Sequence, residues 1–252
     1  TTAKVWVQDY QLLLLPQLVR DSLSRTTIGF FLHIPFPSFE IYRLLPERTQ
    51  LLRGMMGADI IGFHIHDYAR HFLSSCERLL GVHHFDGQIM YEDRIVSVGM
   101  YPISVDYDKF ARTAKSGAVQ RTGARLRRRY KGQKMVLSID RLDYSKGIPE
   151  RLEAYQRFLA AHPEYHGRVV LQMIAVPSRT TVESYRLLRD QIEQTVGHIN
   201  GIFGTADWMP ISYQFQNRPF DEIVASYKTA DVMLVTPLRD GMNLVAKEYV
   251  AS

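Results

Sequence analysis

Short apolar runs rich in β-branched residues alternate along this chain with longer segments whose apolar residues recur at helical spacing. The pattern is clearest in the second half, where Met135–Ile139, Val169–Ala175 and Ile211–Phe215 each precede a helical segment. Strands that alternate with helices of about 10–15 residues are typical of βαβ units, which build parallel sheets. The sequence therefore predicts an α/β fold.

The other expected elements follow the same alternation. The expected strands are Val5–Val7, Ile28–Leu32, Ile60–Phe63, Met135–Ile139, Val169–Ala175, Ile211–Phe215 and Val232–Thr236, with a hairpin over Gln88–Val98 that turns at Glu92-Asp93. The expected helices are Leu12–Leu23, Tyr68–Leu80, Ile148–Ala161, Val182–Val196, Phe220–Ala230 and one that begins near Asn243. We expect Asp67 to cap the helix Tyr68–Leu80, because its carboxylate can accept the free amide protons of the first turn.

An irregular, polar stretch near residues 102–115 divides this pattern into two α/β units. We expect a first domain over residues 1–110 and a second over residues 111–252. In parallel sheets, ligands bind beyond the carboxyl ends of the strands, and two such units favour a ligand in the cleft between them. The ends of the expected strands are therefore the places to look for a site.

Composition argues against several classes of protein. Apolar residues make up 46% of the chain and charged residues 23%, which is ordinary for a soluble domain. No apolar run approaches the roughly 20 residues that a membrane helix needs. The single cysteine, Cys76, excludes an internal disulfide framework and a multi-cysteine metal site. We therefore expect a cytoplasmic protein with no membrane partner.

The net charge of +5 is a mild excess of basic residues. Arg121, Arg125 and Arg128 recur at helical spacing with little aromatic interleaving, which favours a solvated helix face over a nucleic-acid surface. No nucleic-acid partner is expected. The histidines fit no common zinc spacing, so we expect no metal or other cofactor at His64, His66, His71, His83 and His84.

The segment Ser138–Ile148 places two basic side chains in a turn between an expected strand and an expected helix. Arg141 offers a planar guanidinium and Lys146 a compact ammonium, and together they can clamp a diphosphate without a metal ion. The start of the following helix adds partial positive charge at the same place. The alternative is a surface loop with two ordinary basic residues.

A second strand end, in Thr236–Glu248, combines a glycine turn with the start of a helix. Gly241 allows a ligand to approach the backbone closely, and the free amides of residues 242–244 can meet an anionic oxygen. Glu248 lies about one turn into the helix, where its carboxylate could hold two ribose hydroxyls. The alternative is that Asp240 caps the helix and Glu248 is a surface residue.

Two shorter motifs end strands near the N-terminus. His33 follows a strand and lies in a loop that Pro35 and Pro37 make rigid, although a lone histidine at such a place is often structural. Asp9, within Gln8–Gln11, also follows a strand. Its carboxylate can accept hydrogen bonds from sugar hydroxyls, cap a helix, or do both.

Together these motifs resemble the trehalose-6-phosphate synthase family. Arg141–Gly147, Asp240–Glu248 and His33–Ser38 match that family's signatures, and Ser178-Arg179 matches as well. The resemblance covers essentially the whole chain. It implies a GT-B fold, in which two Rossmann-like domains with parallel sheets, here both incomplete, enclose the active site in the cleft between them.

The resemblance also implies an activity. Glucose would pass, with retention of its anomeric configuration, from UDP-glucose or another nucleoside diphosphate glucose to glucose 6-phosphate, giving trehalose 6-phosphate. Neither a metal nor a protein nucleophile would take part, and the leaving diphosphate would accept the proton of the acceptor. The electrostatic task of the protein would be to stabilise that diphosphate as the sugar becomes cationic.

The residues that the resemblance assigns fall into three groups. The catalytic group is Asp9, His33, Arg141 and Lys146, of which His33 would meet the glucose 6-hydroxyl. The donor-binding group is Arg141 and Lys146 on the diphosphate, Glu248 on the ribose, Asp240, Gly241, Met242 and Asn243 on the transferred glucose, and Leu244 and Val245 near the diphosphate and nucleoside. The acceptor-binding group is Asp9 at the point of transfer and Arg179 on the phosphate.

The chain departs from the family at two places. Gln8 and Gln11 stand where most members have histidine, and glutamine cannot titrate near pH 7, which leaves the acceptor less certain. The family's chain also starts before Thr1 and continues beyond Ser252, so we expect this sequence to be a fragment. Whether a phosphatase domain is fused to it, and whether it forms homo-oligomers, stays open.

Two other functions remain in view. A glucosylglycerol-phosphate synthase would share the donor site and use a different acceptor. A non-catalytic paralogue that senses sugar phosphates would fit the glutamines at 8 and 11, although Arg141, Lys146, Asp240 and Glu248 are intact.

Overall fold

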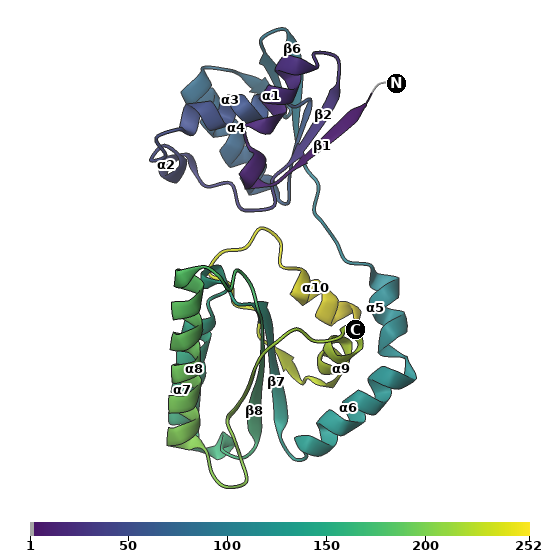
Figure 1. Cartoon of the computed structure of the whole chain (residues 1–252), viewed down its shortest axis with the longest axis vertical. Coiled ribbons are helices and arrows are strands. Elements are labelled where there is room, and N and C mark those ends of the chain that lie inside the picture. The colour runs from purple at the N-terminus through teal and green to yellow at the C-terminus, as the bar shows by residue number, and fades with distance from the viewer. Residues whose placement is uncertain (1–2) are drawn as a thin grey trace. The chain divides into compact units, whose positions relative to one another are not determined.

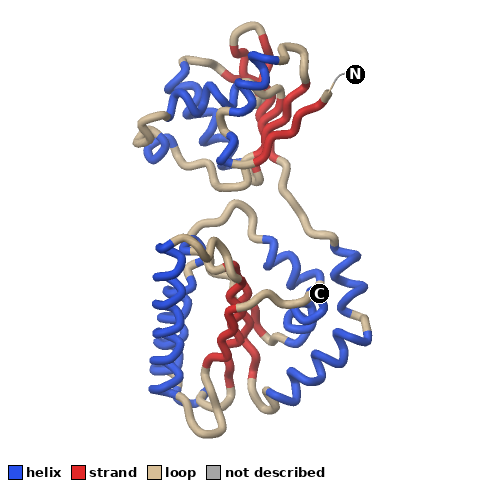
Figure 2. The backbone as a smooth tube through the Cα atoms, in the orientation of Figure 1, coloured by secondary structure: helices blue, strands red, loops and turns tan. Residues whose placement is uncertain are grey.

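The computed structural model describes residues 3–252. These residues form two compact units, which meet between Ile103 and Ser104 along the chain. Each unit contains a β-sheet with helices packed against it (Figures 1 and 2). The expected α/β class with parallel sheets is therefore confirmed.

The first unit is built on a mixed six-stranded sheet in the order β1-β2-β3-β6-β5-β4. Its strands are β1 (Lys4–Gln8), β2 (Thr27–Phe31), β3 (Ile60–Phe63), β4 (His84–Phe85), β5 (Gln88–Tyr91) and β6 (Arg94–Met100). Its helices are α1 (Leu15–Ser22), α2 (Phe39–Tyr42), α3 (Arg48–Met56) and α4 (His66–Leu80), with a 3-10 turn, η1 (Tyr10–Leu12). Strands β1, β2, β3 and β6 run parallel, whereas β5 pairs with β6 and β4 in antiparallel fashion.

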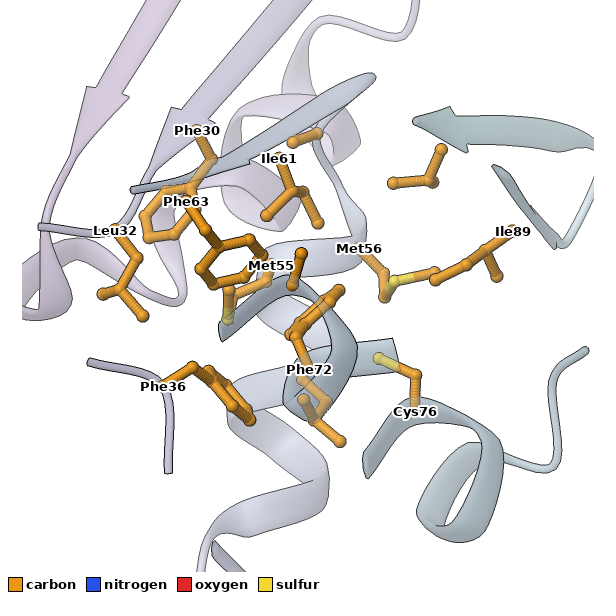
Figure 3. Close-up of a cluster of buried hydrophobic side chains, with 14 of the residues drawn as sticks. Phe30, Leu32, Phe36, Met55, Met56, Ile61, Phe63, Phe72, Cys76 and Ile89 are labelled. Atoms are coloured by element: carbon orange, nitrogen blue, oxygen red, sulfur yellow. The ribbon is translucent and has the colours of Figure 1, made fainter. Parts of the chain in front are cut away.

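The core of the first unit lies between this sheet and helices α3 and α4. Phe30, Ile61 and Phe63 of the strands meet Met55 and Phe72 of the helices in one buried cluster (Figure 3). Each of these side chains is removed from water almost completely. Burial on this scale, about 1.5–3 kcal/mol for a large apolar side chain, fixes the strands and therefore the loops at their carboxyl ends.

The second unit has a parallel four-stranded sheet in the order β10-β7-β8-β9. Its strands are β7 (Lys134–Arg141), β8 (Val169–Val176), β9 (Ile211–Phe215) and β10 (Val232–Met233). Its helices are α5 (Tyr107–Ala114), α6 (Gly117–Arg129), α7 (Ile148–Ala161), α8 (Glu183–Phe203), α9 (Phe220–Thr229) and α10 (Leu244–Ala251), with 3-10 turns η2 (Tyr144–Lys146) and η3 (Pro163–Tyr165). Helices α7 and α8 cover one face of the sheet, and α5, α6, α9 and α10 lie on the other (Figure 1).

Most elements lie where the alternation predicts them. Helix α7 and strand β9 have the predicted bounds, and the predicted hairpin turn is confirmed by the pairing of Tyr91 with Arg94. Helix α8 runs seven residues beyond the predicted end at Val196. Gly197 and Gly201 weaken its helical propensity, but burial of Ile199 against the sheet carries the helix past them.

Several expectations at element ends or between elements are wrong. Residues 107–114, expected to be irregular, form helix α5, because Asp106 caps it by accepting a hydrogen bond from the Lys109 amide and Phe110 and Ala114 are buried. Ile65, not Asp67, is the N-cap residue of α4, and Asp67 instead lies in the first turn. Strand β10 ends at Met233, three residues before the predicted Thr236. Helix α3 was not expected, because the packing of its glycines decides it. A Cβ at Gly54 would lie 2.7 Å from the Leu13 carbonyl oxygen, and one at Gly57, just after α3, 2.3 Å from the Gln17 nitrogen, so the two segments approach closely at these glycines.

Candidate functional site

The loop after β7 is shaped by two residues in the predicted basic turn. The Asp143 carboxylate accepts hydrogen bonds from the Ser145 amide at 2.9 Å and the Ser145 hydroxyl at 2.7 Å. Gly147 then takes a left-handed conformation with φ of 62° and starts α7. The chain therefore turns sharply at Lys146, which lies at the strand end as predicted.

This loop is joined to the loop that follows β10. The amides of Leu238 and Arg239 both donate to the Ser145 carbonyl, at 2.8 and 3.3 Å. A Cβ at Gly147 would lie 2.6 Å from the Thr236 carbonyl oxygen, so the two backbones touch where a side chain would not fit. Two motifs that lie about ninety residues apart in the sequence therefore form one structure.

An ion pair connects the two motifs at their centre. Lys146 Nζ lies 2.5 Å from Asp240 Oδ2, and both side chains are largely buried. The same Asp240 oxygen accepts from the Asn243 amide at 3.1 Å, and the other accepts from the Gly241 backbone at 3.0 Å. The predicted donor residues Lys146, Asp240, Gly241 and Asn243 are thus in direct contact.

A buried arginine lies beneath the two loops. Arg151, on α7, is 3% exposed and donates to Asp140 at 2.7 Å, to the Thr236 hydroxyl at 2.8 Å and to the Lys146 carbonyl at 3.0 Å. It also donates to the Ser138 hydroxyl. One side chain therefore links β7, the turn after it and the end of the β10 segment.

Asp140 is the carboxylate that balances this arginine. Burial raises its pKa, because the charged form is poorly solvated there, while Arg151 opposes that shift. We did not predict this pair from the sequence. The signal was present, because Arg151 occupies an apolar position of α7 between Ile148 and Leu152 and in line with Tyr155.

Helix α10 and the residues before it hold the rest of the predicted donor group. Asn243 is its N-cap, and its side-chain oxygen accepts from the Ala246 amide at 3.1 Å. The predicted alternative, with Asp240 as the cap, is therefore wrong. Glu248 accepts from the Tyr227 hydroxyl of α9 at 2.7 Å, so it is held by a neighbouring helix rather than lying loose on the surface. Met242, Leu244 and Val245 are half-buried at the start of this helix.

Two exposed arginines follow neighbouring strands of the same sheet. Arg141 ends β7 and is paired in register with Val176 of β8, and Arg179 follows three residues later. Arg179 has a left-handed φ of 46°, and its guanidinium donates to the Tyr185 hydroxyl at 2.9 Å. Tyr185 in turn donates to Asp143 at 3.0 Å.

The same contacts keep the Asp143 carboxylate in the turn ionised. Burial would raise the pKa of Asp143, but hydrogen bonds from Ser145 and Tyr185 together with the charge of Arg141 outweigh it and lower that pKa. The carboxylate therefore stays ionised and holds both the turn after β7 and, through Tyr185, Arg179.

In the first unit, the structure brings Gln8, Asp9 and His33 together at the ends of β1 and β2. The His33 amide donates to Asp9 Oδ1 at 3.3 Å, and His33 Nε2 lies 2.6 Å from Gln8 Oε1. The His33 ring also packs against Phe31 at 4.7 Å and His64 at 5.4 Å between centroids. Gln11 lies in η1 and is exposed.

Asp9 has an unusual backbone. Its φ of 70° and ψ of 173° fall in a region that only glycine adopts easily, at a cost of about 1–3 kcal/mol for other residues. It precedes η1, but its side chain makes no capping hydrogen bond. The alternative that Asp9 serves as a helix cap is therefore not supported. Strain of this kind is often found where a side chain must point in one direction.

Comparison with known proteins places this arrangement in a family. The family model of glycosyltransferase family 20 matches residues 2–252. Alpha,alpha-trehalose-phosphate synthase [UDP-forming] 2 of Aspergillus fumigatus is 52% identical over 98% of this chain and 53% of its own length. The chain spans about half the length of the curated relatives it matches.

Solved structures agree with the sequence relatives. An alpha,alpha-trehalose-phosphate synthase (UDP-forming) from Burkholderia xenovorans, in complex with glucose-6-phosphate, is 36% identical with a TM-score of 0.92 over 98% of this chain and 55% of that one. A structure from E. coli, bound with UDP-2-fluoro glucose, is 37% identical with a TM-score of 0.93 and the same coverage of both chains.

Among residues 3–252, no helix is both long and apolar enough to cross a membrane, and no three His, Cys, Asp or Glu side chains converge as a metal site would require. The fold, the joined strand-end motifs and the match along almost the entire sequence lead to one conclusion: this chain belongs to glycosyltransferase family 20.

Proposed function

We propose that the protein carrying this chain transfers glucose from UDP-glucose to glucose 6-phosphate with retention, giving trehalose 6-phosphate. The observation that carries the proposal is the contact of Lys146 with Asp240, where two separate motifs join at the carboxyl end of a parallel sheet, in the loop that follows Arg141. That edge of a sheet is where nucleotides bind in related folds. The relatives at 52% identity are UDP-forming trehalose-phosphate synthases.

On the donor side, each group has a task that fits its chemistry. Arg141 and Lys146 carry the positive charge that a diphosphate requires, and Glu248 is an acceptor for two ribose hydroxyls. Asp240, Gly241, Met242 and Asn243 surround the transferred glucose. Leu244 and Val245 lie near the diphosphate and nucleoside at the start of α10.

The reaction itself breaks the bond between glucose C1 and the diphosphate oxygen. The new bond joins C1 to the acceptor hydroxyl oxygen on the same face, and the hydroxyl proton passes to the departing diphosphate. Negative charge grows on that diphosphate in the transition state, so Arg141 and Lys146 bind it more strongly there than in the ground state. No protein nucleophile and no metal ion is needed for these steps.

On the acceptor side, Arg179 binds the phosphate of glucose 6-phosphate, and Asp9 and His33 contact the sugars at the point of transfer. Gln8 Oε1 lies 2.6 Å from His33 Nε2, and this hydrogen bond holds the imidazole in one orientation. Unlike the histidine of most family members, the glutamine therefore fixes the orientation of His33 without supplying a group that titrates near pH 7. We also place the protein in the cytoplasm, where both substrates occur as soluble metabolites.

The test of this function is a product assay on the natural protein. With UDP-glucose and glucose 6-phosphate we expect UDP release and a phosphorylated disaccharide whose new linkage is α at both anomeric carbons by NMR. Turnover with glycerol 3-phosphate in place of glucose 6-phosphate would assign a glucosylglycerol-phosphate synthase instead. Absence of turnover with both acceptors would assign a non-catalytic paralogue.

The assignment of Arg179 can be tested separately. Arg179→Ala should raise the Michaelis constant for glucose 6-phosphate about 10- to 100-fold, as expected for a lost charged hydrogen bond, and change that for UDP-glucose little. Arg186→Ala is a matched control, because Arg186 is an exposed arginine close to Arg179 in the sequence, in helix α8, and pairs with Glu183. Equal effects of Arg179→Ala on both substrates would give this residue a structural role.

A further inference from the structure

Strand β8 contains a polar side chain where a buried strand of a parallel sheet is normally apolar. Its first seven residues are all buried, and Gln172 is the one amide among them, at 3% exposed. Within the described residues, Gln172 Oε1 has no hydrogen-bond donor. An amide left in this condition costs free energy, so a buried glutamine here indicates a function other than packing.

Gln172 faces a polar pocket of about 300 Å³ between α6, α9 and the edge of the sheet. Ile174 and Leu126 supply apolar surface, and Gln214 of β9 and Ser226 of α9 supply further polar groups. Ser226 is itself buried and donates its hydroxyl to the Glu222 carbonyl. The pocket is thus partly apolar and partly hydrogen-bonding, like those that hold small polar metabolites.

The charge around this pocket is mainly positive. Arg125 and Arg129 lie one turn apart on the same face of α6 and both line the pocket. Arg218 is fixed from the opposite side, where it donates to Gln214 at 2.7 Å and to Glu222 at 2.9 Å. Three guanidinium groups therefore surround one carboxylate, and guanidinium is the side chain best suited to phosphate.

We propose that this pocket binds a small phosphate ester that carries free hydroxyl groups. The phosphate pairs with Arg125 and Arg129, and the carbon skeleton lies on Ile174 and Leu126. The Gln172 amide, whose oxygen is buried from solvent, turns on binding so that a ligand hydroxyl donates to that oxygen. The requirement for a hydroxyl donor follows from the buried Gln172 oxygen, which a bare oxyanion between the arginines leaves unsatisfied.

The pocket shares no residue with the proposed donor and acceptor groups. The two are nevertheless neighbours along α9, because Ser226 lines the pocket and Tyr227 holds Glu248 at 2.7 Å. Binding at this pocket should therefore be separable by mutation from binding at the proposed active site.

The experiment is a calorimetric titration of the natural protein with glycerol 2-phosphate, a hydroxyl-bearing phosphate ester, and in parallel with inorganic phosphate. Arg125→Ala/Arg129→Ala should weaken binding of glycerol 2-phosphate about tenfold or more. The matched control is Arg121→Ala/Arg128→Ala, which removes two exposed arginines of the same helix that do not line the pocket.

Two more variants locate the ligand. Gln172→Leu should weaken glycerol 2-phosphate several-fold and inorganic phosphate less, because the amide serves the hydroxyl and not the phosphate. Arg179→Ala, which removes the proposed acceptor phosphate contact, should leave the pocket affinity unchanged. The proposal is overturned if the wild-type protein does not bind glycerol 2-phosphate, if both double variants lose affinity equally, or if Arg179→Ala abolishes binding. Equal behaviour of Gln172→Leu toward both probes would overturn the requirement for a hydroxyl.

Discussion

The strand-end loops of the two units are held in place by different physical means. In the second unit, Arg151, Asp140 and the Lys146–Asp240 pair connect segments from separate parts of the sequence through charges and hydrogen bonds. In the first unit, the loop after β2 is anchored by Phe36, whose ring packs on Tyr42, Phe63 and Phe72. Charge and hydrogen bonds therefore fix the loops of the second unit, which carry the proposed donor residues and Arg179, whereas apolar packing fixes the loop after β2.

This difference fits the roles that we propose for the two sets of loops. Groups that stabilise a departing diphosphate act best when they are already oriented, because no reorganisation is then needed during the reaction. The buried network under the donor loops supplies that orientation. On the acceptor side, the strained backbone of Asp9 aims one carboxylate, which costs stability that the surrounding core supplies.

The largest expected effect comes from removing the buried arginine. Arg151→Ala should lower the free energy of unfolding by about 3–5 kcal/mol, because it leaves the Asp140 carboxylate, which is 5% exposed, without its partner. Denaturant unfolding measures this change. Arg157→Ala is the control, since Arg157 forms an exposed pair with Glu153 on the same helix and should cost less than about 1 kcal/mol.

The replacement of both charges distinguishes the network from simple packing. Arg151→Met/Asp140→Leu should recover much of the lost stability, since a buried ion pair is often no better than apolar side chains of similar size. The donor loops would then lack the hydrogen bonds to Thr236 and to the Lys146 carbonyl, so turnover should stay low. Full turnover in this variant would contradict the idea that charge fixes the donor side.

A smaller effect is expected at the point where the two donor loops touch. Gly147→Ala should lower the free energy of unfolding by about 2 kcal/mol or more. A positive φ is unfavourable for alanine, and its Cβ would clash with the Thr236 carbonyl oxygen. Gly132→Ala is a matched control with φ of 82° and open space around it, so only the backbone term of about 1 kcal/mol applies. Equal losses in the two variants would show that the close approach does not matter.

On the proposed acceptor side, we expect a substitution that raises the free energy of unfolding instead of lowering it. Asp9→Gly should raise the free energy of unfolding by about 1 kcal/mol, because glycine relieves the strained backbone while one weak hydrogen bond to His33 is lost. The same variant should lose most transferase activity. Asp9→Asn keeps both the strain and an acceptor oxygen, so its stability should match the wild type. A loss of stability in Asp9→Gly would show that this backbone is not strained.

Removal of divalent metal should have the smallest effect of all. If Arg141 and Lys146 supply the charge that neutralises the diphosphate, initial rates in EDTA should equal those in Mg²⁺ within error. A steady-state assay of the natural protein with both substrates measures this. Loss of activity in EDTA, recovered by Mg²⁺ or Mn²⁺, would show that the donor side depends on a metal ion.

The sequence predicts the fold well wherever hydrophobic periodicity is strong. The bounds of α7 and β9 follow directly from it. Helix α3 was not predicted, because Gly54 interrupts a short pattern of Leu52, Met55 and Met56 at helical spacing. The close approach of Gly54 and Gly57 to α1 favours glycine at both positions, and helix propensity alone does not reveal this.

For the candidate site, the sequence locates the loops but not their contacts. The types of side chain at Arg141, Lys146 and Asp240 indicate anion and sugar binding, yet no spacing shows that Lys146 and Asp240 pair across 94 positions. Arg151 could have been found, since a charged residue on the apolar face of a helix requires a buried partner. The strain at Asp9 could not, because any residue type can be forced into that conformation.

The orientation of charge on the donor side is tested most directly by single-turnover kinetics of the natural protein at saturating UDP-glucose. Arg141→Ala and Lys146→Ala should each slow the chemical step about 10²–10³-fold, as found when one preorganised electrostatic donor is removed. Arg239→Ala, an exposed arginine of the neighbouring loop, should leave that rate unchanged. If Arg141→Ala and Lys146→Ala weaken donor binding but leave the single-turnover rate intact, these residues only anchor the donor, and the leaving diphosphate is stabilised elsewhere.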